Sequence, residues 1–127
     1  MRCVLATVLL VLAVSCDVPH STQLLANVSE PGKAADGVPA PEVISLIQAT
    51  LKEHGLEALP GNHDGTLWGS RRPPMFVVEI GTGLGTVTAQ FSQVNGSRMP
   101  SEDYQAAVAA LRERLVGRLG ASAVSVR

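Results

Sequence analysis

The hydrophobic and polar positions recur with helical spacing in two stretches of the chain. Between residues 41 and 54 the apolar side chains fall on one face, which predicts an amphipathic helix with the stripe Val43, Ile44, Ile47 and Leu51. A second stripe predicts a helix that begins near Ser101, and it consists of Tyr104, Val108, Leu111, Leu115 and Leu119. Gly55 and Gly120 follow the two stretches, and each glycine can end a helix in a left-handed conformation.

Residues 75–94 follow a different pattern, which predicts two strands. A compact apolar run from Phe76 to Ile80 precedes a stretch in which apolar and polar residues alternate, from Thr86 to Ser92. The glycine-rich segment 81–85 lies between them and suits a hairpin connection. A closing strand is expected within residues 121–127, and residues 56–68 either add another strand or form a loop.

These elements predict an α+β fold over residues 41–127. We expect a small two-layer domain, with two helices packed on one face of an antiparallel sheet of three to four strands. A domain of this size has room for a single hydrophobic core.

The first residues have the three-part plan of an export signal. Met1 and Arg2 give a positively charged start, and residues 4–14 are apolar except for Thr7. A membrane-spanning helix needs about 20 residues, so the apolar segment is too short for a permanent span. We expect residues 1–15 to be a signal peptide that is removed.

The end of this signal, Leu12-Ala13-Val14-Ser15-Cys16, resembles the lipobox of bacterial lipoproteins. It departs from the family at Ala13, because leucine usually stands three positions before the cysteine. The resemblance implies that Cys16 becomes the first mature residue and carries diacylglycerol on its sulfur, with a further acyl chain such as palmitate on its new amino group. Asp17 resembles the signal that retains lipoproteins on the inner membrane, facing the periplasm. The alternative is an ordinary secretory signal and a secreted protein.

Residues 16–40 are rich in Ser, Pro, Gly and Ala and show no sustained apolar period. This composition predicts a lipid-anchored flexible tether, in which His20 is a solvated linker residue. A flexible coil of that length reaches roughly 27 Å, so the domain would swivel above a bilayer.

Overall charge and cysteine content narrow the functional classes. The formal net charge is −1 over 127 residues, which does not suggest a nucleic-acid partner. Cys3 would leave with the signal, so acylation of Cys16 leaves no disulfide in the mature chain. We expect no cofactor and no metal, because no strong catalytic or metal-binding motif occurs.

The segment from Val78 to Gly85 resembles the glycine-rich first motif of S-adenosylmethionine-dependent methyltransferases. Glu79, Gly81, Gly83 and Gly85 match the family, in which a strand leads through a tight loop into a helix and the loop closes on the cofactor. The alternation after Gly85 predicts a strand instead of that helix, so a glycine-rich hairpin is favoured over a methyltransferase-like fragment.

His63 and Asp64 lie in the turn-forming run Gly-Asn-His-Asp-Gly. Such a pair is suited to binding a metal or orienting a catalytic base, which gives an alternative function as a small exported enzyme or metal-binding protein. Two adjacent residues do not make a site, and an ordinary turn is the favoured interpretation.

Trp68, Arg71 and Arg72 form the best candidate contact loop. Tryptophan and arginine are enriched at interaction hot spots, and the prolines that follow keep the segment out of regular pairing. An equally favoured alternative tucks Trp68 partly into the core. We therefore predict a membrane-tethered, non-enzymatic accessory or binding domain of the bacterial cell envelope, with an envelope protein or lipid headgroups as its partner.

Overall fold

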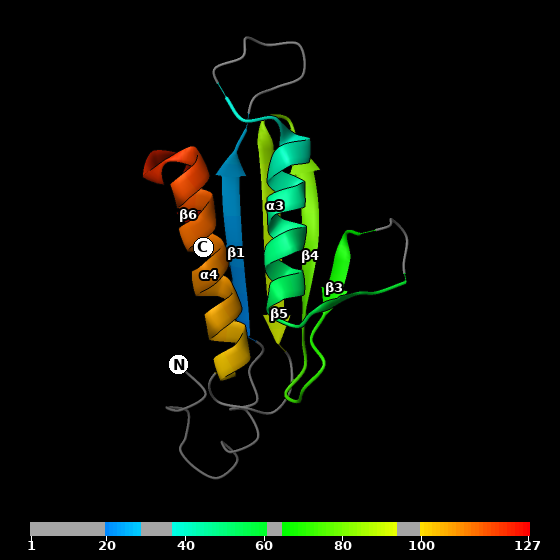
Figure 1. Cartoon of the computed structure of the whole chain (residues 1–127). Helices are drawn as coiled ribbons and strands as arrows, with labels where there is room; N and C mark the ends of the chain where they lie inside the picture. The colour runs from blue at the N-terminus through cyan, green and yellow to red at the C-terminus, as the bar shows by residue number, and fades with distance from the viewer. Residues whose placement is uncertain (1–19, 29–36, 61–64, 94–99) are drawn as a thin grey trace, which may run out of the picture.

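The computed structural model describes residues 20–28, 37–60, 65–93 and 100–127. These residues form two layers, an antiparallel sheet with two helices packed against one of its faces (Figure 1). The α+β class predicted from the pattern is confirmed. The sheet has six strands rather than the expected three to four.

Every strand pair in the sheet is antiparallel, and the strand order is β2-β3-β4-β5-β1-β6. The strands are β1 (His20–Asn27), β2 (Glu57–Ala58), β3 (Leu67–Gly69), β4 (Phe76–Gly83), β5 (Thr86–Gln93) and β6 (Val124–Val126). β4, β5 and β1 have eight residues each and form the long centre of the sheet. The predicted ambiguity over residues 56–68 is resolved as two short strands, β2 and β3, with a connection between them.

β1 belongs to the sheet and not to a tether. All eight of its residues pair with β5, and its other edge pairs with β6. Leu24 is 1% exposed and Ala26 is fully buried, so β1 supplies part of the core. The predicted flexible tether over residues 16–40 is therefore wrong for residues 20–27, including His20.

β4 and β5 form the expected hairpin, with a connection shorter than predicted. Gly81 and Gly83 remain inside β4, where Gly83 pairs with Thr86, and only Leu84 and Gly85 form the turn. Gly85 has φ of +72°, a conformation that side chains with a Cβ rarely adopt. The hairpin turn lies at the end of the sheet opposite to the start of β1.

Both predicted helices are present, as α3 (Ala40–Glu53) and α4 (Glu102–Leu119). Ser101 caps α4 as expected, because its hydroxyl accepts a hydrogen bond of 3.1 Å from the Tyr104 backbone N–H. Gly55 follows α3 with φ of +82°, and Gly120 ends α4 with φ of +94°. A short 3-10 helix, η1 (Ala121–Ala123), leads into β6, so the predicted closing strand is limited to three residues.

The core lies between the sheet and the two helices. Its centre is an aromatic cluster in which Tyr104 of α4 makes edge-on contacts with Phe76 and Phe91, with ring centroids 5.3 Å and 5.7 Å apart. Helix α3 contributes Val43, Ile47 and Leu51, and α4 contributes Leu111 and Leu115, all nearly inaccessible to solvent. Ile44, Val108 and Leu119, which the pattern also assigned to the apolar stripes, pack at the margin of this core.

Candidate functional site

The starts of β1 and β4 and the end of β5 lie in one row across the sheet. Gln93 pairs with His20 on one side and with Phe76 on the other. β1 and β4 both run antiparallel to β5, so the chain enters both strands from the same end of the sheet. Helix α4 begins and α3 finishes at this end as well (Figure 1). We call it the base: the row of His20, Gln93 and Phe76, the loop 70–75, the first turn of α4 and the end of α3.

The loop 70–75 is closed by two hydrogen bonds between Ser70 and Phe76. The Ser70 backbone N–H donates to the Phe76 carbonyl at 3.0 Å, and the Phe76 N–H donates to the Ser70 hydroxyl at 2.9 Å. Pro73 and Pro74 have no backbone N–H and cannot extend the strand ladder. The loop therefore projects from the sheet, and its residues from Arg71 to Pro73 are exposed.

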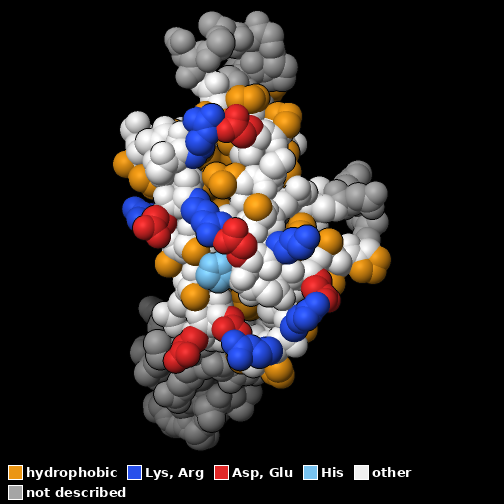
Figure 2. Space-filling model, in the orientation of Figure 1, with side chains coloured by type: hydrophobic (Ala, Val, Ile, Leu, Met, Phe, Trp, Pro, Cys, Tyr) orange, Lys and Arg blue, Asp and Glu red, His pale blue; other side chains and the backbone are white. Residues whose placement is uncertain are grey.

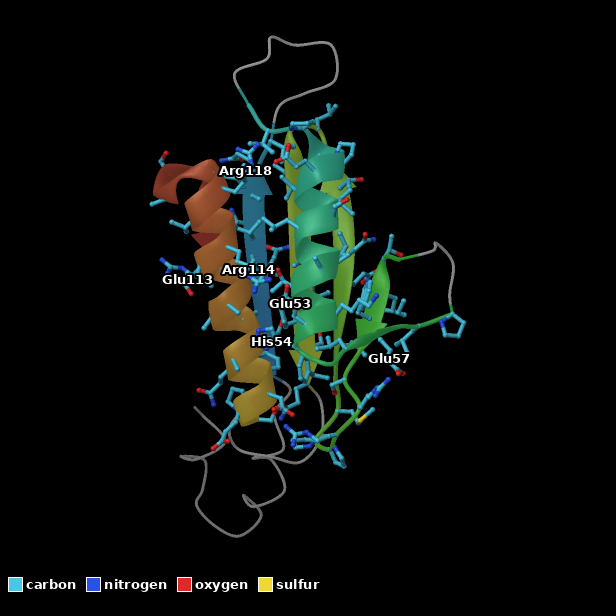
Figure 3. The ribbon with its side chains drawn as sticks, viewed as in Figure 1. Glu53, His54, Glu57, Glu113, Arg114 and Arg118 are labelled. Carbon is cyan, nitrogen blue, oxygen red and sulfur yellow. The ribbon has the colours of Figure 1, made fainter. Side chains whose placement is uncertain are left out.

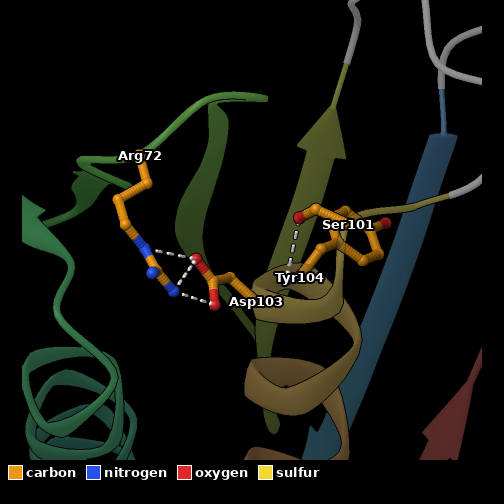
Figure 4. Close-up of polar contacts among 4 residues, drawn as sticks. All are labelled: Arg72, Ser101, Asp103 and Tyr104. Atoms are coloured by element: carbon orange, nitrogen blue, oxygen red, sulfur yellow. Dashed lines mark hydrogen bonds and ion pairs between the residues drawn. The ribbon is translucent and has the colours of Figure 1, made fainter.

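Arg72 joins this loop to the start of α4. Its Nε lies 3.1 Å from one Asp103 carboxylate oxygen, and its Nη2 lies 2.7 Å from the other (Figure 4). The arrangement is bidentate, which is the strongest geometry for an arginine and a carboxylate. The Arg72 side chain is nevertheless 76% exposed, so water weakens the pair and its partner can be exchanged at little cost.

Arg71 is held by a single contact at the other side of the loop. It forms an ion pair with Glu57 of β2, and the Arg71 side chain is 66% exposed. The two arginines are thus matched by two carboxylates, with Glu102 exposed beside them. Figure 2 shows positive and negative side chains interspersed over this view of the molecule, with no extended patch of one sign. The base is a mixed-charge surface rather than a basic one.

A cavity of about 360 Å³ opens at the base, between the end of α3, the loop 70–75 and the start of α4. It is lined by Glu53, His54, Gly55, Ser70, Arg71, Arg72, Phe76 and Asp103. A shallower groove of about 460 Å³ lies across the Arg72–Asp103 pair and is lined by three prolines, Pro73, Pro74 and Pro100. The ion pair therefore divides two hollows, and Arg72 lines both.

Trp68 lies in the core, as the second of the two sequence interpretations had it. It is 8% exposed in β3, and its indole N–H donates a hydrogen bond of 2.8 Å to the Gly65 carbonyl. Trp68 pairs with Val78 of β4 across the sheet. The predicted contact loop is therefore reduced to its two exposed arginines, Arg71 and Arg72.

Three further predicted site residues, Cys16, His63 and Asp64, lie outside the described residues. His54 caps the end of α3 and lines the cavity. Within the described ranges, no group of three or more His, Cys, Asp or Glu side chains is arranged to hold a metal ion.

The glycine-rich motif has the hairpin geometry and not the geometry of a methyltransferase. In that family a helix should follow the loop, whereas Gly81 and Gly83 are strand residues and β5 returns antiparallel to β4. A Cβ on Gly81 would lie 2.9 Å from the Thr88 hydroxyl oxygen, so glycine permits this close approach of the two strands. The motif serves strand packing.

Ionic contacts also link the outer surfaces of α3 and α4. Arg118 lies 2.6 Å from Glu42, and Arg114 contacts the buried Thr50 hydroxyl. Arg114 also forms an ion pair with Glu53, and Figure 3 labels both residues. The hydrogen bond from Arg114 holds the pKa of Glu53 below its ordinary value and raises that of the arginine. These contacts fasten the helices to each other.

The face of the sheet that the helices leave uncovered is mostly polar and uncharged. On β1 and β5 it presents hydroxyl and amide side chains: Ser21, Gln23, Thr86, Thr88, Gln90 and Ser92. Gln90 donates a hydrogen bond of 2.7 Å to the Ser21 hydroxyl. The alternation from Thr86 to Ser92 predicts the β5 half of this surface. The β1 half was not predicted, because the strand itself was not predicted.

In comparisons with known proteins, no family model, no curated protein and no solved structure matches the chain. Among the described residues, no helix is both long and apolar enough to cross a membrane.

Proposed function

We propose that the chain is a lipid-anchored, non-enzymatic binding or accessory domain of the bacterial cell envelope. The observation that carries this proposal is the sequence Leu12-Ala13-Val14-Ser15-Cys16 at the end of a short apolar segment. In this account Cys16 holds the acyl chains, and the folded domain is exposed at the membrane surface. Two or three acyl chains give stable attachment, where one gives only marginal binding.

The closeness of the anchor to the fold supports a surface-bound domain. Only Asp17, Val18 and Pro19 separate Cys16 from the first residue of β1. A link of this length spans at most about 14 Å, about half the reach expected of a long tether. The domain would sit next to the bilayer.

The exposed arginines of the base support a binding role. Arg71 and Arg72 stand on a projecting loop, and each forms an exposed ion pair that water weakens. A partner that offers oxygen anions can share or replace Glu57 and Asp103. The partner is an envelope protein or the lipid headgroups, as the composition of the loop suggested.

Substitution of Cys16 tests the anchoring. Wild type and Cys16→Ser are expressed in a bacterial host that is fed an alkyne-tagged fatty acid, with Cys3→Ser as the matched control because Cys3 leaves with the signal. We expect wild type and Cys3→Ser to be labelled and membrane-bound, and Cys16→Ser to be unlabelled and either released or stranded as a precursor. The proposal is contradicted if the Cys16→Ser chain loses its signal peptide, has the same apparent mass as the processed wild type and remains in the membrane fraction.

The membrane that carries the protein is a separate expectation. Asp17 directly after the lipidated cysteine favours retention on the inner membrane of a bacterium with two membranes, facing the periplasm. Separation of the two membranes on a density gradient checks it, with recovery in the outer-membrane fraction as the opposing result.

A further inference from the structure

The position of β1 determines which end of the domain lies next to the lipid anchor. β1 begins at His20, in the same row as Phe76 and Gln93, so the chain from Cys16 reaches the sheet at the base. The link from Cys16 to His20 spans at most about 14 Å. The hairpin turn at Leu84 and Gly85 lies about 24 Å farther along the strands. An anchored domain can therefore bring its base to the bilayer much more readily than its hairpin turn.

The loop with the two arginines is at that same end. Phe76, which begins β4, is two strands away from His20 in the shared row, a separation of about 10 Å. Arg71 and Arg72 precede Phe76 and project beyond the row on the loop that Ser70 closes. The start of β1, four residues after Cys16 in the sequence, and the loop with the exposed Arg71 therefore lie at the same end of the sheet.

The chemistry of the base fits lipid headgroups. The pair with Asp103 engages two of the three guanidinium nitrogens of Arg72, and a guanidinium carries five N–H donors, so capacity remains for a phosphate. Glu57 and Asp103 are complementary in charge to the ammonium group of phosphatidylethanolamine, and the arginines are complementary in charge to its phosphate. Met75 is 48% exposed beside the arginines and adds an apolar contact at headgroup level.

From these observations we infer that the base is the membrane-facing end of the domain, and that Arg71 and Arg72 contact the headgroup phosphates of the bilayer that holds Cys16. The inference rests on the proposed function, because it takes Cys16 as the point of attachment. It adds an orientation: the hairpin turn at Leu84, which is 88% exposed, and the uncovered polar face of the sheet remain available to the surrounding compartment.

The test uses the single tryptophan as a built-in distance probe. Trp68 pairs with Val78, two residues beyond the base row, and so lies about 7 Å above that row along the strands. The mature chain from Cys16 is coupled through its only cysteine to a maleimide lipid in vesicles of phosphatidylethanolamine and phosphatidylglycerol that contain dansyl-labelled headgroups. Chemical coupling replaces acylation by the cell, so a failed orientation is distinguishable from a failed lipoprotein assignment.

Four coupled proteins separate the short link from the arginine contact. They are the wild type, a form with 24 Gly/Ser residues inserted between Pro19 and His20, and the Arg71→Gln/Arg72→Gln variant of each. The inserted coil alone reaches roughly 27 Å, so it frees the domain from the geometric constraint. A further extended chain with Arg112→Gln/Arg118→Gln is the matched control, because Arg118 pairs with Glu42 far from the base. Melting curves verify that every variant remains folded.

We expect strong energy transfer from Trp68 to the headgroups in the short wild type and in its Arg71→Gln/Arg72→Gln variant, because the link enforces the orientation. In the extended chain transfer persists with the native arginines, and it falls severalfold in the Arg71→Gln/Arg72→Gln form alone, while the matched control retains it. Weak transfer in the short wild type overturns the orientation. Equal transfer in the extended chain with and without Arg71 and Arg72 overturns the headgroup contact and leaves a protein partner as the ligand of the loop.

Discussion

The helix-covered core and the base share Phe76 but are stabilised by different forces. In the core, Phe76 packs against Phe91 and Tyr104, and the surrounding side chains are almost completely buried. In the base, five residues earlier, Arg71 is two-thirds exposed and held by an ion pair. Burial of an apolar side chain stabilises a domain by kilocalories per mole, whereas an exposed ion pair contributes about 0 to 1 kcal/mol. Sequence changes in the base are therefore free to serve binding.

The largest expected effect tests whether β1 belongs to the core. Leu24→Ala should lower the free energy of unfolding by about 2–5 kcal/mol, because it removes a side chain that is 1% exposed beneath the helices. Leu25→Ala is the matched control, since Leu25 lies on the uncovered face of the same strand and should have a much smaller effect. Denaturant unfolding measures both. If both substitutions change the free energy of unfolding equally and only slightly, residues 20–27 are a tether and not part of the core.

This contrast also shows how far the sequence specifies the fold. The two helices and the hairpin were predicted because each carries a clear period and a suitable cap or turn. β1 was missed because Leu25 interrupts the alternation of Thr22, Leu24 and Ala26, and because its place between β5 and β6 depends on backbone pairing with distant segments. Local pattern does not report such pairing.

The candidate site was predicted less completely than the fold. Arg71 and Arg72 were selected from composition, but their neighbours Glu57 and Asp103 come from separate elements that only the folded chain brings together. Trp68 was ambiguous because the prolines suggested a loop, whereas its pairing with Val78 places it in a strand. The start of β1 and the arginine loop lie at one end of the sheet because of the register of three strands, which no local motif encodes.

An intermediate effect is expected where the core contains a polar group. The Tyr104 hydroxyl lies 2.8 Å from the Thr22 hydroxyl, so Tyr104→Phe should cost about 1 kcal/mol at neutral pH. Burial raises the pKa of Tyr104 above its ordinary value of 10.0. The unfolded tyrosine therefore ionises first, and the wild type should lose stability as the pH rises through and above 10, whereas Tyr104→Phe should lose less. Unfolding curves recorded from about pH 8 to about pH 11, a range that brackets the ordinary tyrosine pKa, measure this difference in stability. Parallel pH profiles for the two proteins would contradict it.

The smallest expected effect concerns the exposed ion pairs between α3 and α4. The hydrogen bond from Arg114 lowers the pKa of Glu53 below 4.5, so the pair stabilises the fold above that pH and loses its effect as the pH falls through the lowered value. Glu53→Gln should reduce stability slightly at neutral pH, and the difference from wild type should vanish in acid and shrink in high salt. Thermal melting from neutral to acidic pH checks the trend. A difference that grows in acid would have the wrong sign for this mechanism.

The central claim, that the domain is fixed by lipid with its base beside the membrane, depends first on the chemistry of Cys16. The most direct measurement is the intact mass of the processed protein extracted from the membranes of bacterial cells. We predict a chain that begins at Cys16 and carries the added mass of diacylglycerol on the cysteine, with or without a further acyl chain on the new amino group. A processed chain whose mass equals that of its amino acids alone would contradict the account, since nothing would then hold His20 and the arginine loop at the bilayer.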